Sequence, residues 1–207
     1  MSRTDTACRT ARRGAVAPGS AWALVTGAGS GIGRCYALRL AALGYNLLLA
    51  GNRQQPLEET ARAIRERTPE AGRRIVTLTT DLARLDAAEE LHDFTRREGI
   101  EIDVVINNAG IFSFCDILHT PPERIERIIL LHDVTNTQLC RLYAADMVRR
   151  GCRGHILNMS SYSLWMPFPG LSLYSASKAY LRAFSVAFAK EVREHGIRVT
   201  AGYPAGG

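Results

Sequence analysis

Short apolar runs alternate with longer stretches of helical spacing along most of this chain, and this alternation limits the fold more than any other feature. Strands that alternate with helices join by right-handed crossovers into a parallel sheet covered on both faces. The sequence therefore predicts one α/β domain with a doubly wound parallel sheet. The predicted strands are AWALVTG, NLLLAGN, RIVTLTT, IDVVINNAG, GHILNMSS and IRVTAGY, and the predicted helices span residues 31–45, 57–67, 85–98, 122–150 and 173–194.

The turn after the first predicted strand is rich in glycine. It reads TGAGSGIG over residues 26–33, with glycines at 27, 31 and 33. Missing side chains let the backbone turn sharply and approach a pyrophosphate, whose charge is met by free N–H groups at the start of the next helix. Ligands of such sheets bind at the carboxyl ends of the strands, where this turn lies. Its place between a strand and a helix favours a dinucleotide site over a merely tight turn.

Five motifs follow one another along the chain. They are TGAGSGIG, Asp81-Leu82 after the third predicted strand, NNAG at residues 107–110, NMSS ending at Ser161, and YSASK at residues 174–178. In these motifs and their order, the chain from residue 21 onward resembles the short-chain dehydrogenase/reductase family. GHILNMSS is similar to the ketoacyl and hydroxysteroid reductase branch of that family. The resemblance implies a Rossmann-type fold and an oxidoreductase that uses a nicotinamide cofactor.

Tyr174 and Lys178 lie four residues apart in a predicted helix, so both side chains are expected on one face. A free phenol has a pKa of about 10, and a nearby ammonium favours the phenolate. The resemblance implies that Tyr174 is the general acid/base, that Lys178 contacts the nicotinamide ribose, and that Ser161 holds the substrate oxygen. The neighbouring Ser160 is interpreted as structural.

The residues after the second predicted strand indicate which cofactor is preferred. NAD enzymes of this fold usually carry an acid about 20 residues beyond the glycines, whereas NADP enzymes tend to place an arginine near the 2′-phosphate. Here no acid occurs before Glu58, and Arg53 lies at the expected distance. NADP is therefore favoured over NAD, with an exposed loop cation as the alternative interpretation of Arg53. Arg34 is a weaker candidate for the same phosphate.

The resemblance also assigns cofactor-binding residues at the other strand ends. Asp81 is expected to approach the adenine, while Asn107 and Asn108 hold the central strand and the cofactor rather than touch substrate. The predicted cofactor-binding set is Gly27, Ser30, Gly31, Ile32, Gly33, Arg53, Asp81, Leu82, Asn108, Ala109, Gly110, Tyr174, Lys178 and Pro204.

Two features depart from the family's pattern. The family has an asparagine in the fourth helix that helps to hold a water beside the lysine, and here ILLHDVTN puts His132 at that position, with Asn136 one turn later. His132 is a candidate catalytic residue because a histidine pKa near neutrality suits proton relay; a hydrogen-bonded helix histidine is the alternative.

The second departure is at the end of the chain, which reads GYPAGG after the sixth predicted strand. We therefore expect a C-terminally truncated domain at residues 21–207, without the family's lid and last strand, which leaves a sheet edge exposed.

Charge and cysteine content bear on partners and compartment. The net charge is +6, and residues 1–20 hold +3 of it, from Arg3, Arg9, Arg12 and Arg13 against Asp5. We expect a flexible basic leader there, with organelle targeting as an alternative. The five cysteines are odd in number and scattered, which argues against disulfides and a zinc site and favours a cytoplasmic protein. No run reaches the ~18 to 20 apolar residues of a membrane span.

The preferred function is an NADP(H)-dependent oxidoreductase that interconverts a carbonyl and a secondary alcohol on a small molecule. One alternative is a cofactor-binding protein without turnover, because His132 and the missing lid alter the site. The other is a nucleic-acid or surface-binding role of the basic leader, which the nearly balanced charge of the remaining chain disfavours. A homo-oligomer is compatible with a full-length form. The apolar residues around the YSASK segment indicate either an apolar substrate pocket or, equally, part of the core between sheet and helix, and we expect an apolar substrate. They are Met159, Tyr162, Leu164, Trp165, Met166, Phe168 and Leu171.

Overall fold

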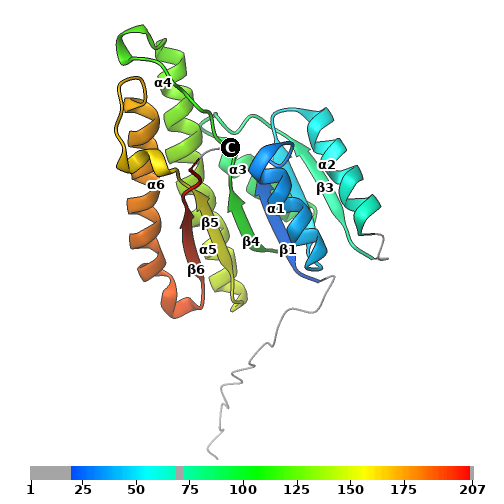
Figure 1. The fold of residues 1–207 in the computed structure, drawn as a ribbon. Coiled ribbons are helices and arrows are strands. Elements are labelled where there is room, and N and C mark those ends of the chain that lie inside the picture. Colours follow the sequence, from blue (N-terminus) through cyan, green and yellow to red (C-terminus); the bar gives the residue numbers. More distant parts are fainter. Residues whose placement is uncertain (1–19, 69–71, 206–207) are drawn as a thin grey trace, which may run out of the picture.

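The computed structural model describes residues 20–68 and 72–205, so the predicted leader lies outside the described residues except for its last position. The described chain forms a six-stranded parallel sheet in the order β3-β2-β1-β4-β5-β6 (Figure 1). Strand order reverses between β1 and β4, which confirms the predicted doubly wound sheet. The strands are β1 (Trp22–Thr26), β2 (Asn46–Gly51), β3 (Ile75–Thr79), β4 (Ile102–Asn107), β5 (His155–Met159) and β6 (Arg198–Gly202).

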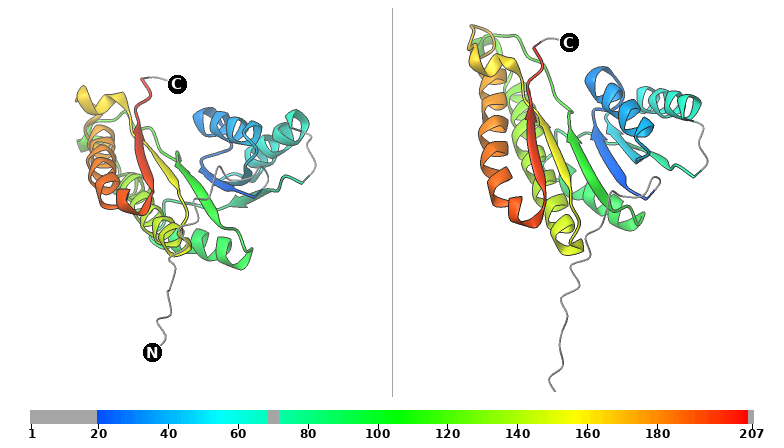
Figure 2. Two further views of the ribbon diagram at one scale, coloured as in Figure 1. Left: turned by 90° about the horizontal axis from the view of Figure 1, so that it is seen from below. Right: turned by 60° about the horizontal axis from the view of Figure 1, so that its bottom comes forward.

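Helices cover both faces of this sheet. One face carries α1 and α2, and the opposite face carries α3, α5 and α6 (Figure 2). The α-helices are α1 (Gly31–Ala42), α2 (Gln54–Arg67), α3 (Ala87–Arg97), α4 (Pro122–Ile129), α5 (Asn136–Arg150) and α6 (Ser172–Glu191). The shorter elements are the 3₁₀ turns η1 (Ile117–His119), η3 (Tyr162–Trp165) and η4 (Arg193–His195), and the π-helical turn η2 (Leu130–Thr135).

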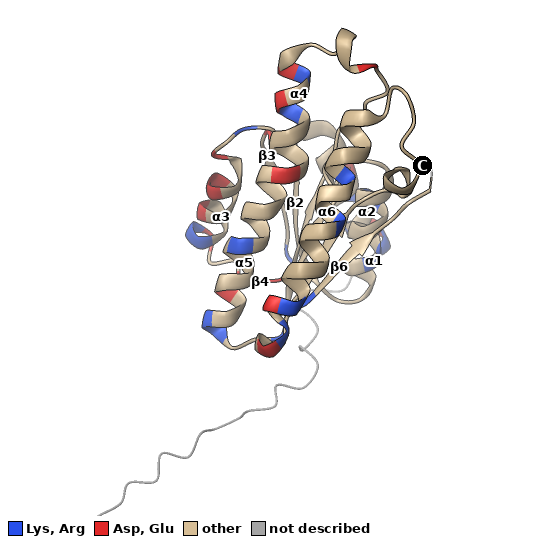
Figure 3. Cartoon of the chain, turned by 90° about the vertical axis from the view of Figure 1, so that its left-hand side faces the viewer, with Lys and Arg blue, Asp and Glu red and all other residues tan. Residues whose placement is uncertain are grey.

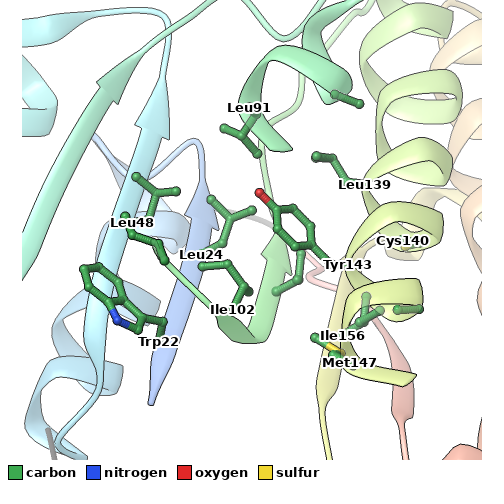
Figure 4. Close-up of a cluster of buried hydrophobic side chains, with 14 of the residues drawn as sticks. Trp22, Leu24, Leu48, Leu91, Ile102, Leu139, Cys140, Tyr143, Met147 and Ile156 are labelled. Carbon is green, nitrogen blue, oxygen red and sulfur yellow. The ribbon is translucent and has the colours of Figure 1, made fainter. Parts of the chain in front are cut away.

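The core has two halves because successive residues of a strand point to opposite faces. In β2, Leu48 packs into the cluster beneath α3 and α5, whereas Leu47 and Leu49 pack into the cluster beneath α1 and α2. Figure 4 shows the first cluster, where Tyr143 of α5 lies close to strand residues. Each fully buried leucine contributes roughly 2 kcal/mol, so an uninterrupted apolar run stabilises both layers at once.

The predicted helical stretch over residues 122–150 is present, but it is not α-helical throughout. The α-helix α4 ends at Ile129, the π-helical turn η2 follows, and α5 begins at Asn136. Apolar periodicity hides such a turn, because it changes the hydrogen-bond spacing without interrupting the helical stretch. His132 lies within η2. The residue that departs from the family's pattern thus lies where the helix itself departs from α geometry.

The carboxyl ends of all six strands meet at one edge of the sheet because the strands are parallel. This edge brings together the glycine turn after β1, Arg53 after β2, Asp81 after β3, Asn108 after β4, Ser161 after β5 and Pro204 after β6. Residues spread over most of the chain therefore share one site.

Basic and acidic residues are interspersed along α3, α4 and α5 (Figure 3). These helices thus carry mixed charge rather than a continuous run of basic residues. Within residues 20–68 and 72–205, none of the helices combines the length and the apolar character that crossing a membrane requires.

Candidate active site

A cleft of about 910 Å³ opens along the carboxyl edge of the sheet. Most of the predicted site residues line it. They are Gly27, Ser30, Gly31, Ile32, Arg53, Asp81, Leu82, Asn108, Ala109, Gly110, Ser161, Tyr174 and Pro204. Gly33, His132 and Lys178 are buried residues that support this wall from behind.

The glycine turn has the shape and polarity of an anion site. Gly33 must lack a side chain, because a Cβ there would overlap the carbonyl oxygen of Gly27. Gly31 has a φ of +51°, and a Cβ built on it would meet no atom within 4 Å. Ser30 makes no side-chain cap bond, and the first turn of α1 contains no acid. The first N–H groups of α1, which have no intrahelical partner, thus fit the pyrophosphate of a dinucleotide.

Asn108 joins the end of β4 to the end of β1. Its Nδ2 donates to the Thr26 carbonyl oxygen at 3.1 Å, and the backbone N–H groups of Asn108 and Ala109 each donate to Thr26 Oγ1 at 3.0 Å. Asn107 is buried and donates from Nδ2 to Asn158 Oδ1 at 2.9 Å. The two asparagines therefore hold the central strands, as predicted.

Asp81 lies in the cleft wall with an arginine that sequence reasoning missed. Arg127 of α4 donates from Nη1 and Nη2 to the two carboxylate oxygens of Asp81, at 2.9 and 3.2 Å. This guanidinium holds the pKa of Asp81 below its ordinary value. Arg127 gave no sequence signal, because it lies 46 residues from its partner on a helix without a motif. Arg53 is exposed in the same cleft.

Tyr174 is half-buried and lines the same cleft as the glycine turn. Its ring packs edge-on against Phe112, with ring centroids 5.2 Å apart. Burial raises the pKa of Tyr174 above 10.0, and hydrogen bonding with Ser161 lowers it in part. Ser161 Oγ itself accepts a hydrogen bond from the Ser163 N–H at 3.2 Å.

Lys178 is buried behind the tyrosine. Its Nζ donates to the Met159 carbonyl oxygen at 2.9 Å and lies 5.6 Å from the centroid of the Tyr174 ring. Burial lowers the pKa of Lys178 to about 8, and the Asp133 carboxylate opposes this shift. The expected net lowering of the tyrosine pKa is not found, because desolvation of the phenol dominates and the opposing effect comes from the hydrogen bond with Ser161.

His132 and Ser160 both make hydrogen bonds within the protein. His132 is fully buried, with hydrogen bonds on both ring nitrogens, and burial lowers its pKa to about 3. These contacts agree with the alternative of a hydrogen-bonded helix histidine. Ser160 Oγ donates to the Lys178 carbonyl oxygen at 2.7 Å, as expected of a structural residue.

Apolar side chains form the rest of the cleft wall. Four of the seven predicted apolar residues line it, namely Tyr162, Met166, Phe168 and Leu171. Met159 is instead buried in the domain, and Trp165 packs against Tyr203 with ring centroids 4.8 Å apart. Ile111, Phe112 and Leu131 also line the cleft and were missed. The first two follow NNAG directly, which is the signal that identifies them.

A doubly wound sheet with a glycine-rich turn at the point where the strand order reverses defines a dinucleotide-binding class of proteins. A family model described as short chain dehydrogenase matches residues 21–206, and the chain belongs to this family. The very-long-chain 3-oxoacyl-CoA reductase of Pyrenophora tritici-repentis is 36% identical over 186 residues, which cover 88% of this chain and 53% of that protein. Human 17-beta-hydroxysteroid dehydrogenase type 3 is 34% identical over 174 residues, covering 83% and 54%.

Solved structures agree with this assignment. A short-chain dehydrogenase from Sphingobium yanoikuyae in complex with NADPH superimposes with a TM-score of 0.82 at 32% identity, over 89% of this chain and 70% of that one. The predicted family, its ketoacyl and hydroxysteroid branch, and the fold are thereby confirmed. The chain spans about half the length of the curated relatives it matches.

Proposed function

We propose that this chain is an NADP(H)-dependent oxidoreductase that interconverts a carbonyl and a secondary alcohol on an apolar small molecule. One observation carries the proposal: Ser161 and Tyr174 line the same cleft as the glycine turn, and Lys178 lies one helical turn beyond the tyrosine. The cofactor supplies or accepts the hydride when it is bound. The side chains of the protein handle the substrate oxygen and its proton.

Tyr174 donates its phenol proton to the carbonyl oxygen in reduction and accepts a proton from the alcohol in the reverse direction. Burial keeps the phenol protonated at neutral pH, as a donor requires. Ser161 Oγ accepts a bond from the Ser163 N–H, and it has one proton of its own, which it can donate to the substrate oxygen in place of the phenol oxygen. Lys178 is mostly protonated at pH 7, given a pKa of about 8, and contacts the cofactor ribose.

NADP is the favoured cofactor. Arg53 lies exposed in the cleft wall just beyond β2, where its guanidinium suits a 2′-phosphate. Asp81 and Leu82 border the same part of the cleft and are assigned to the adenine end. The NADPH complex of the solved relative supports this preference.

The cleft wall favours an apolar substrate. Phe112, Met166 and Phe168 are 65%, 60% and 60% exposed. Large apolar side chains at a cleft are usually covered when a ligand binds, so their exposure indicates an apolar ligand. Two relatives are named for a very-long-chain 3-oxoacyl-CoA and for a hydroxysteroid, which supports the same class. We therefore assign bulky or long-chain ketones as substrates.

Replacement of Tyr174 by phenylalanine tests the function. Tyr174→Phe removes one oxygen and keeps the ring, so we expect kcat for carbonyl reduction to fall by roughly two to four orders of magnitude with NADPH affinity retained. NADPH consumption is measured with long-chain 3-oxoacyl and bulky ketone substrates, and NADPH binding by fluorescence titration.

Tyr180→Phe is the matched control, because Tyr180 lies on the same helix and its hydroxyl bonds to Thr137 on α5. We expect this variant to keep its turnover. Near-normal turnover of Tyr174→Phe removes the tyrosine from its role. NADPH binding without consumption by the unmodified protein favours the alternative of a cofactor-binding protein.

A further inference from the structure

Three hydrogen bonds run in one line from the loop after β4 to the first turn of α6. The Ile111 N–H bonds to His132 Nε2 at 2.9 Å, and His132 Nδ1 bonds to Ser177 Oγ at 2.8 Å. Ser177 Oγ then bonds to the Tyr174 carbonyl oxygen at 2.8 Å. His132 and Ser177 are both buried, and the bond between their side chains is shielded from water.

The two ends of this line determine where its protons are. A backbone N–H can only donate and a carbonyl oxygen can only accept. His132 Nε2 must therefore offer a lone pair to Ile111, and the Ser177 hydroxyl must give its proton to Tyr174. Ser177 Oγ is then left to accept from Nδ1. The imidazole is thus neutral, with its proton on Nδ1.

We propose that His132 and Ser177 form a directional hydrogen-bond bridge that positions Tyr174, in which His132 stays neutral and does not relay protons. Both are positioning residues, because neither lines the cleft as defined for the described residues. The expected effect of the bridge on turnover rests on the proposed function, whereas the protonation state of the His132 ring is independent of it.

The bridge joins the two sides of the site. Gly110 lines the cleft directly before Ile111, and a Cβ at Gly110 would lie 3.1 Å from His132 Nε2 and 3.6 Å from Lys178 Nζ. The imidazole thus fills the space behind the cleft wall. It also packs edge-on against the Tyr174 ring, with centroids 5.8 Å apart and planes at 75°. The bridge therefore fixes the Tyr174 turn of α6 relative to the wall formed by residues 108–111.

The charges around the imidazole agree with a neutral ring. From α6, Tyr174 packs against it and Lys178 acts on it through its charge, and Asp133 is its neighbour in η2. The loop after β4 contributes Gly110 and Ile111, which do not titrate. Burial, and then the positive charge of Lys178, lower the pKa of His132 to about 3. A second ring proton would also place an N–H against the N–H of Ile111.

Nitrogen-15 NMR of the histidine-labelled full chain tests the ring directly. The chain has five histidines, and the His132 signals are those lost in His132→Gln. We expect a protonated Nδ1 and an unprotonated Nε2 for this ring, both constant from about pH 5 to pH 8. A ring that titrates in this range, or that carries its proton on Nε2, overturns the proposal.

Substitutions of Ser177 test the bridge and its role in turnover. Ser177→Ala removes the middle of the line, so we expect a shifted Nδ1 signal and a kcat lower by about threefold to tenfold, with NADPH affinity unchanged. Ser177→Thr keeps a hydroxyl and should restore much of the loss. An unshifted Nδ1 signal in Ser177→Ala overturns the bridge whether or not the protein turns over, and an unchanged kcat overturns the positioning role.

Two substitutions of His132 give a second comparison between matched variants. His132→Gln keeps one acceptor and one donor, whereas His132→Phe keeps a ring but neither group. We expect His132→Gln to retain a higher kcat than His132→Phe. If the unmodified protein consumes no NADPH, the proposed function fails, and the NMR signals of the ring still decide the bridge.

Discussion

Tyr174 and Lys178 share one face of α6, yet burial shifts their pKa values in opposite directions. The pKa of the phenol is raised and that of the ammonium is lowered, because desolvation penalises the charged form of each group. Both shifts favour the neutral form of the side chain. In the protein without a bound ligand, the Tyr174 phenol therefore keeps a proton that it can donate, which suits the reduction of a carbonyl.

At the same scale, we propose that Arg53 sets the cofactor preference. We expect Arg53→Ala to weaken NADPH binding by about tenfold and to leave NADH binding nearly unchanged, because only NADPH carries the 2′-phosphate that the guanidinium would bind. Dissociation constants for both cofactors are measured by fluorescence titration. Arg62→Ala, at an exposed position in α2, the helix that directly follows Arg53, is the control. Equal affinity of the unmodified protein for NADPH and NADH contradicts the assignment.

At the scale of elements, one ion pair ties α4 to the loop after β3. Arg127 and Asp81 are 44% and 37% exposed, so their attraction adds little to global stability. Their geometry matters more, because two parallel bonds orient the Asp81 carboxylate in the cleft. The backbone N–H of Ala83 also donates to Asp81, at 3.0 Å. This pair thus shapes the part of the cleft that we assign to the adenine.

Loss of this pair should affect cofactor binding rather than folding. We expect Arg127→Gln to raise the dissociation constant of NADPH by about threefold to tenfold, while the free energy of unfolding changes by less than about 1 kcal/mol. Arg127→Lys should be intermediate, since an ammonium cannot make two parallel bonds. Titration and denaturant unfolding measure the two quantities. Unchanged NADPH affinity in Arg127→Gln would show that the ion pair is not needed for the site.

At the scale of the whole molecule, buried titratable groups make the free energy of unfolding depend on pH. The pKa of His132 is about 3 in the folded protein, against an ordinary value of 6.5. The unfolded chain therefore binds more protons between these values, and the free energy of unfolding falls as the pH drops from 6.5 toward 3. Asp133, whose pKa burial raises to about 7, acts with the opposite sign.

A His132→Gln variant should lack the histidine part of this dependence. We expect its deficit in the free energy of unfolding, relative to the unmodified protein, to shrink by about 2 kcal/mol between about pH 7 and pH 4.5. The contribution of Asp133 is common to both proteins and drops out of the difference. Denaturant unfolding at several pH values measures it. A deficit that is constant with pH would mean that the ring titrates alike in the folded and unfolded chain.

Two predictions at this scale stay predictions. A cytoplasmic location rests on the cysteine pattern alone, and a homo-oligomer on the resemblance to the family. The six parallel strands, by contrast, follow from apolar runs such as NLLLAGN, which bury side chains on both faces.

The sequence revealed those features that depend on residues close to one another along the chain. The glycine turn and the Tyr174–Lys178 pair were found from residue type and spacing along the chain, and the roles expected of Ser161, Tyr174 and Lys178 came from the resemblance to the family. The doubly wound fold followed from periodicity, since parallel strands need apolar residues on both faces and helices between them.

Contacts between distant segments were decided only by the tertiary structure. His132 meets Ser177, 45 residues away, and Arg127 meets Asp81, 46 residues away, and no local spacing encodes either pair. The pKa values of Tyr174 and Lys178 were likewise not readable, because desolvation depends on everything that packs around a group. The sequence by itself determined which groups are present at the strand ends, and the tertiary structure decided which of them are charged and which neighbours hold them in place.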